Sequence, residues 1–259
     1  MIKAVLFDIG GTLHTVTNNV ELRTKFAQRL IDRLEVYDIR IDLPPDSLGG
    51  LLHKNAEAYK HRSEKNRCEL PAARIWNEYY LAQFEIGEAR LAPIAEELSF
   101  LYDYERVCNI RRPNVKRTMK ELREMGIRLG VISNIISYSF VPHILKEYNI
   151  DQYMECVILS SEAGFRKPDA RIFDLALTRL GLPAGEAAYV GDTISRDVTG
   201  ARNANLAMMI QIKNPAIAHR DAAFRENAPE PDFLIEQLHE IPRIISAYNT
   251  QNQGGEHHD

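Results

Sequence analysis

Residues 1–15 read MIKAVLFDIGGTLHT, and the apolar run within this stretch ends on a carboxylate. A continuous apolar run such as residues 2–8 is typical of a strand that is buried on both faces of a parallel sheet. Asp8 stands where the predicted strand stops, and Gly10 and Gly11 follow it. A carboxylate that ends so apolar a run favours a functional site over a simple turn.

The second half of the chain alternates short apolar runs with amphipathic segments. The expected strands are residues 127–133, 156–160, 187–192 and 206–212. The expected helices are residues 113–125, 137–148, 169–180, 195–204 and, last, 233–247. This alternation predicts an α/β fold, with a Rossmann-like parallel sheet core covered by helices.

Residues 20–108 show a different pattern, because no strand signal appears in them. Their apolar residues recur at helical spacing, as do Leu22, Phe26, Leu30 and Leu34. We expect this block to form a separate all-helical cap domain inserted into the core. The predicted division is a core of residues 1–16 and 110–247, a cap of residues 17–109, and a disordered tail of residues 248–259.

The composition is that of an ordinary soluble globular protein of 259 residues, with 45% hydrophobic and 26% charged residues. A net charge of -4 argues against a general nucleic-acid binder, and no stretch has the length and apolarity of a transmembrane helix. We see no signal peptide, and Cys68, Cys108 and Cys156 fit neither a metal site nor a disulfide framework. A cytoplasmic protein is expected, with His257 and His258 solvated rather than metal-bound.

Three of the expected strands end on a polar residue, and these residues are Asp8, Ser133 and Asp192. Ligands bind at the carboxyl ends of parallel strands, and two carboxylates that face each other there repel unless a cation lies between them. Oxygen ligands without a nearby cysteine or histidine pair favour Mg2+. Asp197, in the segment that follows Asp192, could ligate the metal directly or through water.

Other polar residues near these strand ends suit a phosphate group. Lys167 lies in the loop sequence GFRKPD, where its charge can neutralise that of a phosphate. Ser133 and Asn134 end a strand and can donate hydrogen bonds to an oxyanion. Gly10 and Gly11 let the backbone approach an anion closely.

Four segments together resemble the motifs of the haloacid dehalogenase superfamily, whose members are mostly phosphohydrolases. In order, they are FDIGGTL with Asp8, VISN with Ser133, RKPD with Lys167, and VGDTISRD with Asp192 and Asp197. The helical block resembles the cap that the family inserts between its first and second motifs. The resemblance covers residues 1 to about 213, and four motifs in order are far more specific than one.

The resemblance implies a two-step, Mg2+-dependent hydrolysis. Asp8 would attack phosphorus to give an aspartyl-phosphate, which water then hydrolyses. In the family, the metal is held by groups that correspond here to Asp8, Asp192 and the main-chain carbonyl of Gly10. Asp197 would support the metal directly or through water.

The resemblance also implies how the phosphate is held. Its contacts would come from Ser133, Asn134, Lys167 and Gly11. Thr12 would fix the first loop or hydrogen-bond near Asp8. The implied partner is a small phosphorylated metabolite, with no nucleic acid and no membrane, and the oligomeric state stays open.

Gly10 departs from the family pattern, because the family's phosphatases usually carry a second aspartate at this position. That aspartate protonates the leaving oxygen and later activates water. Three interpretations follow. Another group, such as His14, Thr15 or a cap residue, donates the proton; or the substrates have good leaving groups; or the protein binds phosphorylated ligands with little turnover.

Two other branches of the superfamily that lack this acid are the dehalogenases and the phosphonatases. Gly191 and Asp192 argue against a dehalogenase, because dehalogenases carry Ser-Asn in that place. A phosphonatase would need a cap lysine for a Schiff base, for which Lys54, Lys60 and Lys65 are candidates.

Overall fold

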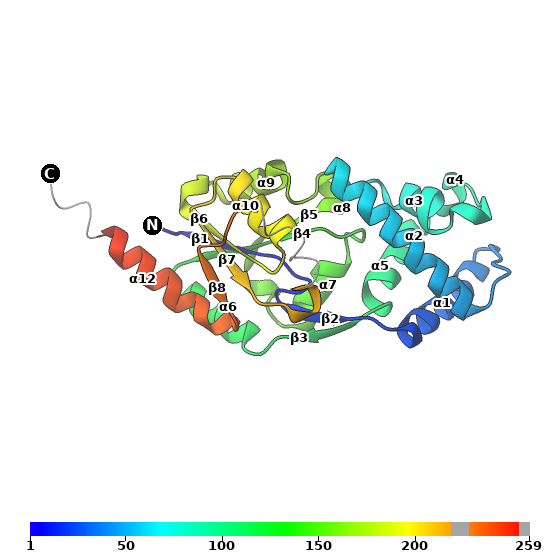
Figure 1. The fold of residues 1–259 in the computed structure, drawn as a ribbon, viewed down its shortest axis with the longest axis horizontal. Helices are drawn as coiled ribbons and strands as arrows, with labels where there is room; N and C mark the ends of the chain where they lie inside the picture. Colours follow the sequence, from blue (N-terminus) through cyan, green and yellow to red (C-terminus); the bar gives the residue numbers. More distant parts are fainter. Residues whose placement is uncertain (219–227, 254–259) are drawn as a thin grey trace.

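The structure, a computed structural model, describes residues 1–218 and 228–253. A parallel sheet of six strands lies at the centre of these residues, in the order β5-β4-β1-β6-β7-β8 (Figure 1). The strands are β1 Ala4–Phe7, β4 Arg128–Ser133, β5 Met154–Leu159, β6 Ala187–Gly191, β7 Met208–Ile212 and β8 Phe233–Ile235. The α/β, Rossmann-like fold predicted from the sequence is therefore confirmed.

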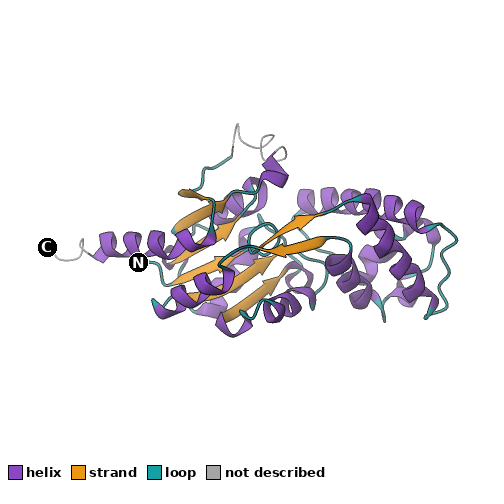
Figure 2. Cartoon of the chain, turned by 90° about the horizontal axis from the view of Figure 1, so that it is seen from below, coloured by secondary structure: helices purple, strands orange, loops and turns teal. Residues whose placement is uncertain are grey.

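Helices cover both faces of this sheet (Figure 2). On one face lie α6 Val115–Glu124, α7 Phe140–Glu147 and α12 Ile241–Gln253. On the other lie α9 Ala170–Leu180 and α10 Thr199–Asn203. Within β1, Val5 and Phe7 pack into the first core and Leu6 into the second, so the strand is buried on both sides. This double burial is the reason for the continuous apolar run at the start of the sequence.

Short helical turns fill the connections between these elements. They are η3 Asp151–Tyr153, α8 Ser160–Ala163, η4 Ala184–Glu186, η5 Ile194–Val198, η6 Pro215–Ile217 and η8 Leu238–Glu240. Of the described residues, no helix is both long and apolar enough to cross a membrane.

The helical segment, defined here as residues 20–105, lies beyond the carboxyl ends of the sheet strands (Figures 1 and 2). Its elements are α1 Val20–Glu35, α2 Pro45–Asn66, α3 Ala72–Ile75, η1 Trp76–Tyr80, η2 Ala82–Phe84, α4 Glu88–Leu91 and α5 Ala95–Glu105. It has an apolar core of its own around the fully buried Trp76, whose Nε1 donates to Ser99 Oγ at 3.0 Å.

A small antiparallel sheet joins the helical segment to the main sheet, and the sequence did not predict it. It pairs β2, His14–Thr17, with β3, Cys108–Arg111. Each strand has four residues, and the two partners are separated in the sequence by the whole helical segment. Pairs this short and this far apart leave no local periodicity from which they could be recognised.

The C-terminal region corrects two further expectations. Residues 233–247 do not form one helix, because Phe233–Ile235 is the edge strand β8 and the helix begins at Ile241. The helix also continues to Gln253, so residues 248–253 are helical rather than part of a tail. The side chain of Asn249 fastens this helix to the residues just before β1, since it accepts from Ile2 N at 2.6 Å and donates to Ile2 O at 2.9 Å. The histidines at 257 and 258 lie outside the described residues.

Helices α1 and α2 pack closely because α2 carries a glycine at their contact. A Cβ built on Gly49 would lie 2.8 Å from the carbonyl oxygen of Arg23 in α1. Gly50, the next residue, is exposed, and a Cβ there would meet no atom within 4 Å. Two adjacent glycines of one helix therefore stand in opposite environments.

We predict opposite effects of alanine at these two positions. Gly49→Ala forces the helices apart and should lower the free energy of unfolding by about 1–3 kcal/mol. Gly50→Ala only removes backbone freedom in a helix and should raise it by about 0.5–1 kcal/mol. Urea denaturation of the two variants measures both values, and a shift of the same sign in both would contradict this account of the α1–α2 contact.

Candidate active site

The carboxyl ends of three neighbouring strands bring together the residues that the sequence singled out. Asp8 follows β1, Ser133 ends β4, and Asp192 follows β6. One carboxylate oxygen from each of Asp8, Asp192 and Asp197 lies within 4.8 Å of the others. A cavity of about 350 Å³ lies between the sheet and the helical segment, and its lining includes Asp8, Ser133, Lys167 and Asp192. Asp197 is buried beneath it and does not line it.

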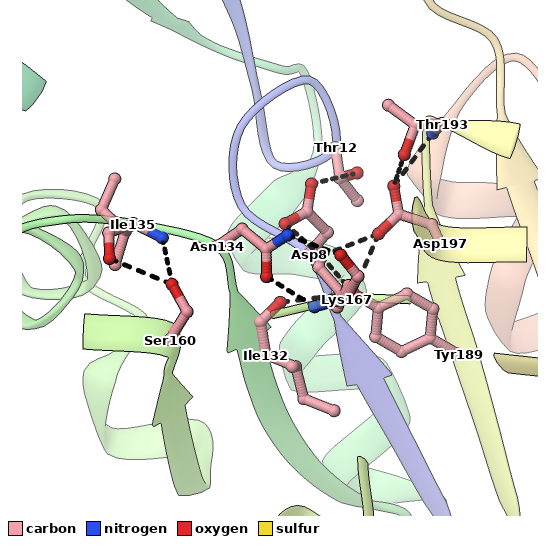
Figure 3. A network of polar contacts seen from close by, with 10 residues as sticks. All are labelled: Asp8, Thr12, Ile132, Asn134, Ile135, Ser160, Lys167, Tyr189, Thr193 and Asp197. Carbon is pink, nitrogen blue, oxygen red and sulfur yellow. Dashed lines mark hydrogen bonds and ion pairs between the residues drawn. The ribbon is translucent and has the colours of Figure 1, made fainter. Parts of the chain in front are cut away.

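Lys167 is the centre of a buried polar network (Figure 3). Its Nζ donates to Asp8 Oδ1 at 2.8 Å, to Asp197 Oδ1 at 2.7 Å and to Tyr189 Oη at 2.7 Å. The side chain is 2% exposed, so the charge is compensated by these partners rather than by water. All three donor positions of the ammonium group are thus satisfied.

Asp197 holds Lys167 in place. Its Oδ1 accepts from Lys167 and, at 3.2 Å, from Tyr189 Oη, while its Oδ2 accepts from the amide and the hydroxyl of Thr193. Burial raises the pKa of Asp197, but the charges of Lys167 and Arg196 outweigh it and leave that pKa below its ordinary value. Because both oxygens are already engaged, the geometry favours a positioning role, and the metal support expected of Asp197, direct or through water, stays a prediction.

Asn134 also positions Lys167 (Figure 3). Its Oδ1 accepts from the backbone amide of Lys167 at 2.9 Å, and its Nδ2 donates to the backbone carbonyl at 3.0 Å. The side chain is therefore held by the lysine loop at the edge of the cavity, and the phosphate contact expected of Asn134 from the sequence stays a prediction. The Ser133 hydroxyl lies at the cavity wall and makes no hydrogen bond to another described residue, and Thr12 Oγ1 lies 3.5 Å from Asp8 Oδ2.

Asp192 offers a vacant oxygen to a cation. Its Oδ2 accepts from Asn214 Nδ2 at 2.7 Å, but its Oδ1 is buried without a hydrogen-bond partner among the described residues. Burial, and then the charges of Asp197 and Asp8, raise the pKa of Asp192 to about 7. Burial also raises the pKa of Asp8, although Lys167 opposes the shift. An oxygen-rich cluster with an unpartnered buried oxygen fits a divalent metal ion such as Mg2+.

Glycine is required beside this cluster. Gly11 has a φ of +90°, and a Cβ there would lie 2.0 Å from Asp192 Oδ2. Gly11 thus serves the site by letting the first loop close onto Asp192. Gly10 is different, because a Cβ there would meet nothing nearer than His14 Nε2 at 3.9 Å and Val16 Cγ2 at 4.0 Å. Position 10 therefore has room for a side chain on the cavity side.

His14 lies beside the space at Gly10 and lines the same cavity. Its Nδ1 is 3.1 Å from Tyr148 Oη. Burial, and then the charge of Arg112, lower the pKa of His14 to about 4, so the imidazole is neutral near pH 7. It can donate a hydrogen bond, but it is not an imidazolium acid that would replace the missing aspartate.

Several residues of this site carry no motif that sequence reasoning could use. Tyr189 lies within a strand, where an aromatic residue ordinarily indicates core. Asn214 lies just past the end of β7, at the same edge of the sheet, which is the one signal that could have found it. Arg166 belongs to the RKPD motif, but its partner was not predicted: it forms a buried ion pair with Glu69 from the connection between α2 and α3, which joins the helical segment to the lysine loop.

Comparison with known proteins gives a consistent assignment. Residues 2–205 match a family model described as haloacid dehalogenase-like hydrolase. The chain is 28% identical over 245 residues to a glyceraldehyde 3-phosphate phosphatase of Methanopyrus kandleri, covering 95% of this chain and 97% of the relative. It is 27% identical over 164 residues to a ribulose-1,5-bisphosphate 5-phosphatase of Halopiger xanaduensis, covering 62% and 63%. The fold is similar to that of a 2-haloacid dehalogenase from Pseudomonas syringae, with a TM-score of 0.65, 21% identity, and coverage of 96% and 100%.

We predict that Asp192 makes the metal-free protein less stable as the pH rises. The carboxyl binds its proton more tightly in the native state, where its pKa is about 7, than in the unfolded state, where it is near 4. The contribution of this carboxyl to the free energy of unfolding is fully present below about pH 4 and is lost as the pH rises through about 7. In EDTA, Asp192→Asn should therefore lose less stability than the wild type between pH 5.5 and 8, by up to about 2 kcal/mol.

Urea denaturation at the two pH values provides the measurement. Asp42→Asn is the matched control, because Asp42 is exposed and should leave the pH dependence unchanged. If Asp192→Asn and the wild type have the same pH dependence, Asp192 does not carry the raised pKa.

Proposed function

The chain belongs to the haloacid dehalogenase-like hydrolase family, and we propose that it is a Mg2+-dependent phosphatase of small phosphorylated metabolites with Asp8 as its nucleophile. The carrying observation is the buried contact of Lys167 Nζ with Asp8 Oδ1 at 2.8 Å, beside the unpartnered Oδ1 of Asp192. The relatives described above are named as phosphatases of glyceraldehyde 3-phosphate and ribulose 1,5-bisphosphate. These names support a small phosphorylated sugar as the substrate class.

Asp8, Asp192 and the main-chain carbonyl of Gly10 would hold the Mg2+ ion. Asp197 supports this set through Lys167 and through its charge near Asp192. When bound, the metal ion would offset the negative charge of the phosphoryl oxygens.

Lys167, Ser133 and Asp8 have separate roles in the proposed phosphoryl transfer. Lys167 fixes the Asp8 carboxylate and adds positive charge where phosphoryl oxygens gather. The Ser133 hydroxyl, at the cavity wall, is placed to donate a hydrogen bond to one of those oxygens. Asp8 attacks phosphorus and forms the aspartyl-phosphate, the leaving oxygen takes a proton, and water then releases phosphate and restores the carboxylate.

The proton for the leaving oxygen is the weak point of this site. Gly10 supplies no acid, and the neutral His14 beside it supplies only a hydrogen bond. Substrates whose leaving groups need little protonation should therefore react best. Acyl and aryl phosphates belong to this group. Alkyl phosphates, which include the sugar phosphates, depend more on an acid and should react more slowly at this site.

We predict that the protein releases phosphate from p-nitrophenyl phosphate with Mg2+, and that Asp8→Asn lowers kcat by about 10³-fold or more. The amide cannot act as the nucleophile, although it keeps the size of the side chain. EDTA should abolish the activity and Mg2+ should restore it. Asp42→Asn, at an exposed site, is the control and should keep full activity. Equal turnover by the wild type and Asp8→Asn would reject the nucleophile.

A second prediction concerns the missing acid. Gly10→Asp places a carboxyl group in the open space at position 10 and should raise kcat/KM for an alkyl phosphate by about 10-fold or more. The gain for p-nitrophenyl phosphate should be smaller, because its leaving group needs little protonation. Gly10→Asn, which has the same shape without an acid, should give neither gain. Equal gains for both substrates would show that proton donation does not limit the wild type.

A further inference from the structure

The cavity over Asp8 is larger than a transferred phosphate requires. Its volume of about 350 Å³ is that of a small-molecule site. The sheet contributes the catalytic wall, with Asp8, Lys167 and Asp192. The helical segment and the residue that follows it contribute the opposite wall, which includes Tyr102 and Arg106. The part of a substrate that leaves with the oxygen has to fit against this second wall.

Five basic residues line the cavity, and three of them are paired within the protein. Lys167 contacts Asp8 and Asp197, Arg166 contacts Glu69, and Lys60 contacts Glu57. Arg106 and Arg196 differ, because the side chain of neither makes an ion pair or a hydrogen bond with another residue that the structure describes. The Nε atom of each is buried without a partner.

The two arginines come from different parts of the fold, because Arg196 lies in η5 and Arg106 directly follows α5. Arg196 adjoins the catalytic carboxylates, since its pKa is raised by Asp197, Asp192 and Asp8 against the effect of burial. Its charge therefore already serves the catalytic cluster. Arg106 follows α5, and its guanidinium lies 4.2 Å from the centre of the Tyr102 ring. Stacking on this buried ring holds the planar group in one orientation and leaves its N–H donors for another partner.

Asp103, an acidic residue of the same cavity lining, feels the charge of Arg106 but is engaged elsewhere. Asp103 lies one helical turn earlier, but its Oδ2 accepts from Ser137 N at 3.1 Å, and no ion pair joins it to Arg106 among the described residues. Burial raises the pKa of Asp103 to about 7, although the hydrogen bond from Ser137 and the charge of Arg106 oppose the shift, so this group is only partly ionised near neutrality. A buried guanidinium donor without a partner is unfavourable, and an anionic ligand would relieve it.

We propose that Arg106 binds a second anionic group of the substrate. The preferred substrates then carry the reacting phosphate at one end and another phosphate, or a carboxylate, at the other. This inference rests on the proposed phosphatase function and makes Arg106 a determinant of specificity, with no part in the chemical step.

Paired substrates that differ in the second anion test the proposal. Ribulose 1,5-bisphosphate is compared with ribulose 5-phosphate, and 3-phosphoglycerate with glycerol 3-phosphate. In the wild type, at least one doubly anionic substrate should exceed its partner in kcat/KM by about 10- to 100-fold, the usual range for a charge-assisted hydrogen bond. A preference in the ribulose pair alone identifies a phosphate as the second anionic group. A preference in the glycerol pair alone identifies a carboxylate.

Arg106→Gln should remove that preference, mainly through KM, and change p-nitrophenyl phosphate turnover by less than about 3-fold. Arg106→Lys keeps the charge but loses the planar fork, so it should retain part of the preference. Arg62→Gln is the matched control, because Arg62 lies in the same helical segment and has a buried unpartnered Nη1, but does not line the cavity. It should keep the full preference.

The outcomes separate this inference from the proposed function. If p-nitrophenyl phosphate is hydrolysed but neither pair shows a preference in the wild type, the role of Arg106 is refuted and the phosphatase stands. An equal loss on all substrates in both Arg106 variants also refutes it. If the wild type hydrolyses no phosphate ester at all, the proposed function itself fails.

Discussion

The contact of Lys167 with Asp8 and Asp197 is the interaction on which the rest of the site depends. A lysine that is 2% exposed loses almost all of its hydration, so its charge survives only if carboxylates are brought to it. The chain supplies Asp8 from the end of β1 and Asp197 from η5, and Tyr189 completes the set. Two carboxylates are compensated in this way, but Asp192 is not, and its raised pKa and unpartnered oxygen mark where further positive charge is needed.

The sequence was sufficient for the sheet and for the residues at its edge, and the reason is physical. A parallel sheet buried on both faces needs continuous apolar strands, so a polar residue at the end of one, such as Asp8 or Asp192, is conspicuous. The residues that hydrogen-bond to these carboxylates and to Lys167 are not marked in this way by the sequence. The sequence pattern predicts that Tyr189 is a core residue and that Asn214 is a turn residue after its strand. The β2–β3 pair joins segments that the whole helical segment separates, so no local pattern reveals it.

Gly10 and Gly11 look alike in the sequence, but the structure gives them opposite constraints. At Gly11 a side chain would collide with Asp192, so glycine is the residue that allows the first loop to close. At Gly10 a side chain has room, so nothing in the packing demands glycine there. The absence of an acid at this position is therefore a chemical property of the site, and it bears on the choice of leaving group rather than on the fold.

Several contacts fasten the helical segment to the catalytic loops, and two of them show how specificity is linked to catalysis. Glu69 pairs with Arg166, the neighbour of Lys167, and Asp103 accepts from the amide of Ser137 in the loop after β4. Both contacts fix the wall that carries Arg106 relative to the wall that carries the nucleophile. Substitutions on the helical wall can change which substrate is bound without moving Asp8, provided that these two contacts are kept. Loss of the Arg166 contact would instead act on the lysine loop, because a buried guanidinium without its carboxylate disturbs the segment that holds Lys167.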